Sequence, residues 1–518
     1  GPLAAGGGRR RPMDWLMIVG FAFASNALFN FLVGLFVAKF LGPAEFGRFA
    51  IAAAVAVMVN TAGFEWIRLS AVRFYSQRTR LERPEIRATL DDCFAALAFI
   101  VSLVVLAITL SGVHLVLSPG LLAMAATAGV ASGLYDYSTA LARARFLDKT
   151  YMGVIIIKNS LGLVLAVGGA WWFGSAALAL AGVALSVAGA LIASGRSLID
   201  RGAGPNHGRW PLAKDFMRYG LPFVGASILF QMIPLANRAL VSGLYGFGET
   251  GQFSLANDIG VRVLSAIAAA MDVLLFQLAV RAEEAHGPAR ARAQLADNMA
   301  SVFAIIAPTS VGLWLILPSF ETLIVPEAFR GPFARYLTAM LPGLFSFVLL
   351  QYTISPMFQI ARRPSPMIIV AIAACAVDAA LILLLPRGDD AHFFALAQTG
   401  AQISGLIAAV AFAATLRPQW PPLRDIAAIV AATGAMALVG APLRAKAPGI
   451  ILLIEQAALG VATFGALAYL LDIARTRARL AALFGKNGDA PLPPARPSAE
   501  TASAQAVRRL AGTRARSS

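Results

Sequence analysis

Charged side chains occur inside long apolar runs of the sequence, where a membrane-spanning helix would place them in hydrocarbon. Arg238 lies late in the run at 219–242, and Asp258 and Arg262 lie in the following run, at 252–280. Each such charge costs roughly 2.5 to 3.5 kcal/mol near the middle of a bilayer, so a helix keeps it only where it faces a polar interior. These residues therefore predict a water-filled cavity.

Arg262 is expected to be the deepest cation in the chain. It lies eleven residues past Gly251, which corresponds to roughly 16 Å of helix and to the middle of an apolar core about 30 Å thick. Asp258 precedes Arg262 by four residues and shares its helical face, so the two side chains are expected to pair. Lys158 is expected about 10 Å from the inner surface, too deep for a loop charge.

Two further arginines are predicted nearer the membrane surfaces. Arg238, with Asn237 beside it, is expected near the outer mouth and Arg68 near the inner one, where each side chain can also extend to an interface. For Arg262 the alternative is an ion pair that only locks two helices. The candidate substrate-binding residues are Arg262, Lys158, Arg238, Arg68, Asp258 and Asn237.

Cations at several depths favour an anionic head group, such as a phosphate or pyrophosphate, because lysine binds it as a point charge and arginine through a fork of donors. Isolated acids within apolar runs leave coupling to H⁺ or Na⁺ open; they are Asp136, Asp272, Asp378 and Glu455. The sequence contains no phosphate-binding glycine loop and no His-Glu-x-x-His motif, and its four histidines are scattered. It therefore predicts no catalytic residue, no cofactor and no metal site, and favours a protein that is not an enzyme.

The composition predicts an all-α polytopic membrane protein. Apolar residues make up 58% of the chain and charged residues 14%, and the mean hydropathy is +0.72. The net charge of +16 comes from Lys and Arg gathered in alternate loops between apolar runs, a pattern that sets membrane orientation and excludes a nucleic-acid partner. By the positive-inside rule both termini are cytoplasmic, which requires an even number of spans.

About fourteen transmembrane helices are predicted, in two six-helix lobes followed by two extra C-terminal helices. The turns at 41–49 (LGPAEFGRF) and 244–253 (LYGFGETGQF) follow the first and seventh spans and indicate a parallel repeat, which places a substrate site between the lobes near the midplane. Pro222 and Pro234 are expected to bend the seventh helix. The predicted segments are an N-terminal tail (1–13), an N-lobe (14–200), a cytoplasmic linker (201–218), a C-lobe (219–416), helices 13 and 14 (417–472) and a disordered basic tail (473–518).

Four short segments resemble the Wzx-like polysaccharide flippases of the multidrug/oligosaccharidyl-lipid/polysaccharide (MOP) exporter superfamily. They are the turn at 41–49, FMRYGLP at 216–222, GQFS at 251–254 and LIVPEAFR at 323–330. The resemblance covers the twelve-helix core. Pro326 differs from the family, which frequently has glycine at this position. The resemblance assigns no binding residue to this sequence.

The resemblance implies a V-shaped pair of lobes with alternating access. It also implies an undecaprenyl-pyrophosphate-linked oligosaccharide as substrate, moved from the inner to the outer leaflet of the bacterial inner membrane for O-antigen, capsule or exopolysaccharide synthesis. Membrane lipids, a polysaccharide polymerase and other assembly proteins are the implied partners. Two alternatives stay open: a cation-coupled multidrug exporter of the same fold, and a membrane glycan polymerase or ligase.

Overall fold

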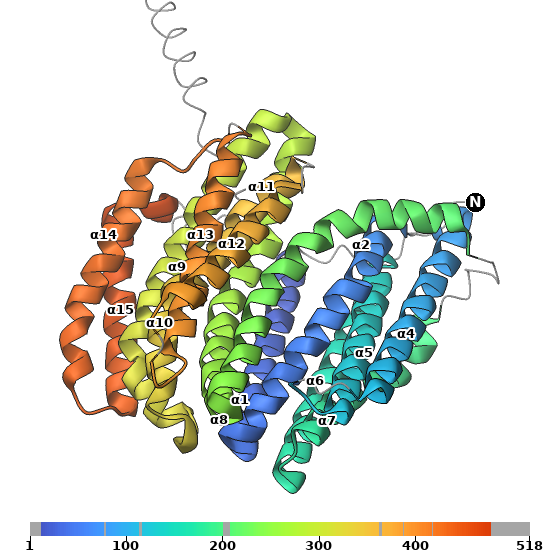
Figure 1. The fold of residues 1–518 in the computed structure, drawn as a ribbon. Coiled ribbons are helices and arrows are strands. Elements are labelled where there is room, and N and C mark those ends of the chain that lie inside the picture. The colour runs from blue at the N-terminus through green and yellow to red at the C-terminus, as the bar shows by residue number, and fades with distance from the viewer. Residues whose placement is uncertain are drawn as a thin grey trace, which may run out of the picture. The chain divides into compact units, whose positions relative to one another are not determined.

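The computed structural model describes residues 12–76, 79–112, 116–199, 208–361, 365–386, 388–416 and 418–477, and every regular element within these ranges is a helix (Figure 1). The helices of the first half are α1 (Pro12–Val59), η1 (Asn60–Phe64), α2 (Glu65–Phe74), α3 (Thr79–Glu82), α4 (Glu85–Ser111), α5 (Pro119–Ala144), α6 (Asp148–Phe173), α7 (Ala176–Leu198) and α8 (Trp210–His286). Those of the second half are α9 (Pro288–Ile324), η2 (Glu327–Phe329), α10 (Pro332–Leu349), η3 (Leu350–Ile354), α11 (Ser355–Ile360), α12 (Ser365–Leu384), α13 (His392–Ala414), α14 (Leu423–Gly440), η4 (Ala441–Ala445), α15 (Ile450–Leu470) and η5 (Ile473–Arg475).

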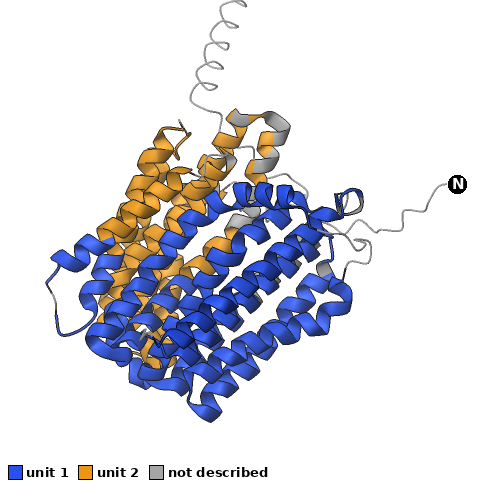
Figure 2. Ribbon diagram, turned by 45° about the vertical axis from the view of Figure 1, so that its right-hand side comes forward, with its two compact units in different colours: residues 1–262, 326–336, 378–398 blue, residues 263–325, 337–377, 399–518 orange. Residues whose placement is uncertain are grey.

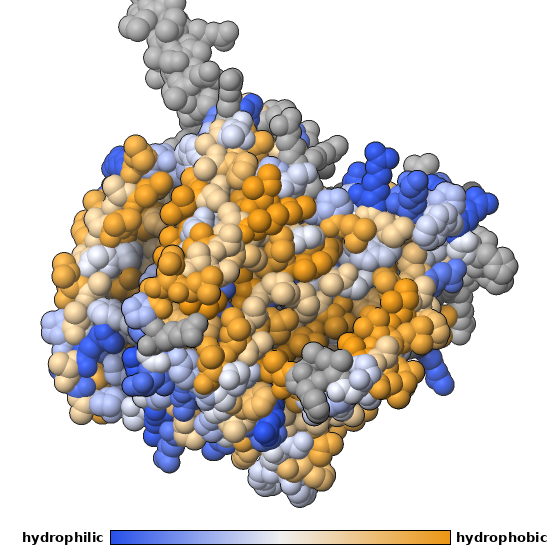
Figure 3. Space-filling model, viewed as in Figure 1, coloured by the Kyte–Doolittle hydropathy of each residue, from blue (hydrophilic) through white to orange (hydrophobic). Residues whose placement is uncertain are grey.

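The predicted all-helical membrane architecture is confirmed. Within the described residues, eleven helices are long and apolar enough to cross a bilayer. Apolar side chains cover much of the helices on the face shown in Figure 3, as expected for a multi-pass membrane protein. The count of about fourteen spans stays a prediction; two of the eleven, Asn26–Phe74 and Trp210–Met271, contain a sharp kink at a glycine.

The chain forms two compact units (Figure 2). Unit 1 contains residues 1–262, 326–336 and 378–398, and unit 2 contains the remaining segments, 263–325, 337–377 and 399–518. The boundary after Arg262 falls inside α8, so this helix contributes to both units. The predicted lobes and linker remain predictions, and most of both predicted tails, residues 1–11 and 478–518, lies outside the described residues.

Aromatic side chains form the core of unit 1 between α2, α4 and α5. The ring of Phe64 lies 4.5 Å from that of Phe94, which in turn stacks on Tyr137 at 5.9 Å. Tyr137 is almost fully buried, and its hydroxyl donates to Asp91 on α4 at 2.6 Å. The polar end of the ring is thereby satisfied within an apolar cluster.

Small residues allow close helix packing in unit 2. The C-terminal helices α14 and α15 pack on each other and on α9 (Figure 1). A Cβ on Gly440 of α14 would lie 2.7 Å from the side chain of Leu315 on α9. The missing side chain at Gly440 therefore allows α14 to pack closely against α9.

The two turns of the predicted repeat share one backbone conformation. Gly42 interrupts α1 with φ 70° and ψ 174°, and Gly246 interrupts α8 with φ 83° and ψ 174°. This combination is essentially restricted to glycine. Pro222 and Pro234 lie inside α8, whereas the residue with non-helical dihedral angles is Gly246. The sharp change of direction therefore occurs at the turn.

The two turns also touch through a reciprocal pair of glycines, five residues after each kink. A Cβ on Gly47 would overlap the carbonyl oxygen of Phe247 and lie 3.0 Å from the amide nitrogen of Gly251. A Cβ on Gly251 would overlap the carbonyl oxygen of Pro43 and lie 3.1 Å from the amide nitrogen of Gly47. Backbone meets backbone, so neither position has room for a side chain.

A glutamate in each turn binds the start of a later helix. Glu45 accepts a hydrogen bond from the N–H of Ala176, the first residue of α7, at 3.1 Å. Glu249 accepts one from the N–H of Ala391, immediately before α13, at 3.2 Å. A carboxylate is stabilising at a helix N-terminus, where N–H groups lack partners within the helix. The contacts of the two turns thus follow the same pattern, which supports the predicted repeat.

Alanine at Gly47 or Gly251 should destabilise the protein by about 1 to 3 kcal/mol, the usual effect of overpacking a site that cannot relax. The measurement is the thermal unfolding midpoint of the purified protein in detergent. Gly248→Ala is the matched control, because a Cβ at this position in the same turn would meet nothing within 4 Å. Equal unfolding midpoints for all three variants would show that the turns separate without cost.

Candidate functional site

Arg262 of α8 lies against the backbone of α1 in unit 1. Its Nη1 donates a hydrogen bond to the carbonyl oxygen of Asn30, and its side chain is exposed. Gly34 lies one turn further along α1, and a Cβ there would overlap Nη1 of Arg262 and lie 3.1 Å from its Cζ. The missing side chain at Gly34 therefore provides the space that the guanidinium occupies.

Three asparagines hold α1 to α6 beside this arginine. Asn30 Nδ2 donates to the carbonyl oxygen of Asn26 at 2.8 Å, and Asn159 Nδ2 donates to Oδ1 of Asn26 at 3.0 Å. Asn159 is 5% exposed, so its amide depends on this partner. The bonds fix the part of α6 that carries Lys158.

Lys158 of α6 directly precedes Asn159, whose amide binds Asn26 of α1, and it supplies a second cation to this region. The ammonium of Lys158 is 5.4 Å from the ring centre of Tyr135, and it interacts electrostatically with both Asp136 and Arg262. Among the described residues, neither Lys158 nor Arg262 forms an ion pair with a carboxylate. Two neighbouring cations without direct counter-ions attract an anion.

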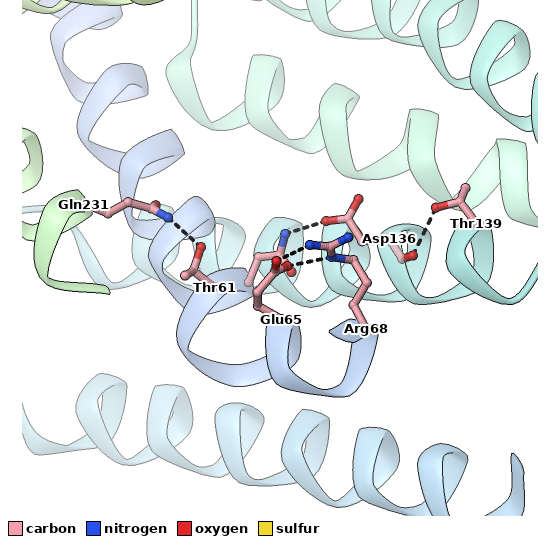
Figure 4. A network of polar contacts seen from close by, with 7 residues as sticks. Thr61, Glu65, Arg68, Asp136, Thr139 and Gln231 are labelled. Atoms are coloured by element: carbon pink, nitrogen blue, oxygen red, sulfur yellow. Dashed lines mark hydrogen bonds and ion pairs between the residues drawn. The ribbon is translucent and has the colours of Figure 1, made fainter. Parts of the chain in front are cut away.

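A polar network surrounds the π-helix η1 (Figure 4). Asn60 Nδ2 donates to Oδ2 of Asp136 at 2.9 Å, and Arg68 binds Glu65 through two nitrogens, with Nε to Oε2 at 2.9 Å. In Figure 4 the guanidinium of Arg68 lies beside both Glu65 and Asp136, and the two interact electrostatically with it. Arg68 is therefore already paired on its own helix. π-helical turns are rare and are frequently found at functional sites.

Arg238 and Asp258 form a separate ion pair within α8, across the turn at Gly246. Their side chains are 7% and 26% exposed, and Arg238 Nη1 also donates to the carbonyl oxygen of Ala50 at 3.2 Å. The expected pairing of Asp258 with Arg262 is therefore wrong, and the side chain of Arg238 is buried beside Asp258. A buried guanidinium needs a counter-charge more than an exposed one does, so Asp258 pairs with Arg238.

Asn237 belongs to a buried network that ties α8 to α12 and α13. Its Nδ2 donates to Oδ1 of Asp378 at 3.3 Å, and Gln398 Nε2 donates to Oδ1 of Asn257 at 2.7 Å. Asn237 and Gln398 are 0% and 1% exposed. The arrangement connects three helices, and the hydrogen bonds of Asn237 go to Asp378 and Gln398 and not to Lys158 or Arg262.

The structure thus brings together two of the six sequence-predicted residues, Lys158 and Arg262, while Arg68 lies in the neighbouring network around Asp136. Asn60 and the asparagines of α1 are not among the residues predicted from the sequence, although the four-residue spacing of Asn26 and Asn30 in an apolar helix was a usable signal. The side chain of Asp272 lies outside the described residues. Within the described residues, no three His, Cys, Asp or Glu side chains are grouped so that they could hold a metal ion.

The arrangement of helices is shared with solved membrane transporters. Lipid II flippase MurJ in an inward closed conformation matches with a TM-score of 0.70 at 14% identity, over 88% of this chain and 99% of that chain. MATE multidrug transporter DinF-BH in complex with R6G gives 0.53 at 12% identity, over 81% and 99%. An inward-facing multidrug resistance MATE family transporter of the MOP superfamily gives 0.51 at 14% identity, over 77% and 99%.

No protein-family model matches the chain, and no curated protein sequence matches it. The structural matches, all at low identity, establish the fold. The chain therefore has the helical fold shared by the MurJ flippase and the MATE transporters. The closer resemblance to the Wzx-like exporters stays a prediction.

Removing the carboxylate of Asp258 should destabilise the protein by about 3 kcal/mol, because Arg238 would remain buried without its counter-ion. Thermal unfolding of Asp258→Ala measures the loss. The double variant Arg238→Met with Asp258→Leu should regain most of it, since apolar residues of similar volume often replace a buried pair without cost. Equal destabilisation of both variants would contradict this role.

Gly34→Ala should weaken binding of inorganic pyrophosphate about 10-fold or more, as expected for loss of a charge-assisted hydrogen bond. The added methyl group meets only the flexible end of Arg262, so the unfolding midpoint should stay unchanged. Calorimetric titration measures the affinity. Gly168→Ala on α6 is the control, because its Cβ would meet nothing within 4 Å. Equal affinities in the two variants would show that the space at Gly34 does not position the guanidinium of Arg262 for binding.

Proposed function

We propose that this protein is a flippase for an undecaprenyl-pyrophosphate-linked oligosaccharide. It moves the lipid from the inner to the outer leaflet of the bacterial inner membrane by alternating access, for O-antigen, capsule or exopolysaccharide synthesis. The observation that carries the proposal is the pair of neighbouring cations, Lys158 on α6 and Arg262 on α8, neither of which forms an ion pair with a described carboxylate.

The chemistry of this pair suits a pyrophosphate. Arg262 uses one nitrogen on the carbonyl oxygen of Asn30, which orients the guanidinium and leaves its other donors for an anion. Lys158 adds a compact charge nearby. Arginine binds phosphate oxygens in a planar fork and lysine binds them as a point charge, so the two complement each other on a group with several oxygens.

Binding of the pyrophosphate at Lys158 and Arg262 would also determine where the sugar and the prenyl tail of the substrate lie. The sugar would occupy the predicted aqueous cavity, where the amide and carboxylate groups around η1 would offer hydrogen bonds. The prenyl tail would remain in lipid beside the apolar outer faces of the helices. The basic loops support a cytoplasmic location of both termini, and a polysaccharide polymerase would receive the product.

The fold is shared by flippases and drug transporters, and the charge of the site favours a lipid-linked anion over a drug. The MurJ structure is described as a lipid II flippase, whereas the matching MATE structures are described as multidrug transporters. The two cations beside α1, Lys158 and Arg262, form no direct ion pair with a described carboxylate, so they attract anions and repel cationic drugs. A multidrug exporter would favour an acid in that position.

Arg262→Ala should reduce lipid export by about 10-fold or more, because it removes charge-assisted hydrogen bonds to the pyrophosphate. The measurement uses proteoliposomes with a fluorescent undecaprenyl-pyrophosphate-linked monosaccharide and a quencher that cannot cross the membrane. Arg196→Ala, which changes an exposed arginine in the last turn of α7, is the control. Unchanged export by Arg262→Ala would remove this residue from the mechanism.

The same preparation separates the two alternatives. A change in the covalent structure of the lipid-linked sugar would indicate a polymerase or ligase. Drug resistance conferred on cells by the wild-type chain, without lipid movement in proteoliposomes, would indicate a multidrug exporter.

A further inference from the structure

Asp136 is a carboxylate that interacts electrostatically with Lys158, one of the two cations of the proposed anion site. It lies on α5, and its Oδ2 accepts a hydrogen bond from Asn60 of η1. The charged groups that face it are Glu65 and Arg68 from α2 and Lys158 from α6. On α4, the Arg87–Asp91 pair lies instead at Tyr137.

The charges around Asp136 divide into two sets. Glu65 and Arg68 neutralise one another through a two-bond ion pair on α2. Arg68 and Lys158 both interact favourably with Asp136, but Arg68 is already paired with Glu65, whereas Lys158 forms no direct ion pair with a described carboxylate. An anion bound to Lys158 would take over that cation and leave Asp136 as an excess negative charge in a surrounding of low dielectric constant.

Asn60 provides an acceptor for a proton on Asp136. Its Nδ2 donates to Asp136, while its Oδ1 is buried and accepts no hydrogen bond from any described residue. An ionised carboxylate is an acceptor only, so it cannot satisfy this oxygen. A protonated carboxyl can, because its O–H would donate to Oδ1 of Asn60 while its other oxygen keeps the bond from Nδ2.

We propose that Asp136 takes up a proton when a pyrophosphate binds Lys158 and Arg262, and that Asn60 holds the protonated carboxyl through two hydrogen bonds. The inference rests on the proposed anion site. The proton comes from water and adds to the Asp136 carboxylate, and no covalent bond forms between anion and protein. Anion and proton then bind together, which couples the occupancy of the site to pH.

Linkage fixes the sign of the pH dependence. If anion binding promotes proton binding, proton binding strengthens anion binding by the same factor. The affinity for a pyrophosphate should therefore fall as pH rises through the range in which Asp136 ionises. Ionisation of the ligand acts in the opposite direction, because a more negative pyrophosphate binds two cations more tightly.

The experiment titrates the purified full-length protein with farnesyl pyrophosphate in buffers of different ionisation enthalpy, which counts the protons taken up. Wild type should take up close to one proton more per bound ligand than Asp136→Asn. The asparagine variant should bind about 10-fold more tightly at pH 8, consistent with removal of one repulsive charge. Asp91→Asn on α4 is the matched control and should behave as wild type.

Infrared difference spectra of the wild-type protein provide a readout that needs no folded variant. Binding of farnesyl pyrophosphate should produce the C=O stretching band of a protonated carboxyl group. Ligand binding without this band, or equal proton uptake by wild type and Asp136→Asn, would overturn the inference while leaving the flippase proposal intact. Absence of binding to wild type, or equal binding to wild type and Arg262→Ala, would overturn the proposed anion site and this inference with it.

Discussion

The balance of charge inside an apolar protein determines which cations of this chain have a fixed counter-ion and which can bind a ligand. A cation in low-dielectric surroundings either has a fixed counter-charge or must face water or a ligand. Arg238 has Asp258, and Arg68 has Glu65. Lys158 and Arg262 are the pair that the described carboxylates leave open, and this difference separates residues that stabilise helices from residues that can bind a substrate.

The glycines of the two turns determine where these charges lie. Because Gly47 and Gly251 bring backbone against backbone, α1 and α8 approach closely at their kinks. Eleven residues beyond Gly251, the side chain of Arg262 still reaches the backbone of α1 at Asn30. The absence of side chains at the turns thus brings this part of α8 close enough to α1 for the arginine to reach it.

The sequence predicted the helical membrane fold and the two equivalent turns, because hydropathy and residue spacing report these directly. It did not predict the partner of Asp258. Four-residue spacing brings Asp258 and Arg262 onto one face, but the competing arginine lies across the turn at Gly246, and its burial decides the outcome. The contact between Asn60 and Asp136 joins distant segments, and no periodic pattern in a single sequence encodes it.

The π-helix η1 has a consequence for how the chain can vary. A π-turn amounts to one residue inserted into an α-helix, and each residue advances the helix by about 100°. A homologue lacking one residue between Asn60 and Phe64 would form an uninterrupted α-helix, with the following segment rotated by that angle relative to Asn60. Glu65 and Arg68 would then leave the side of the helix that meets Asp136, although every charged residue would still be present. The length of this short segment therefore matters as much as its composition.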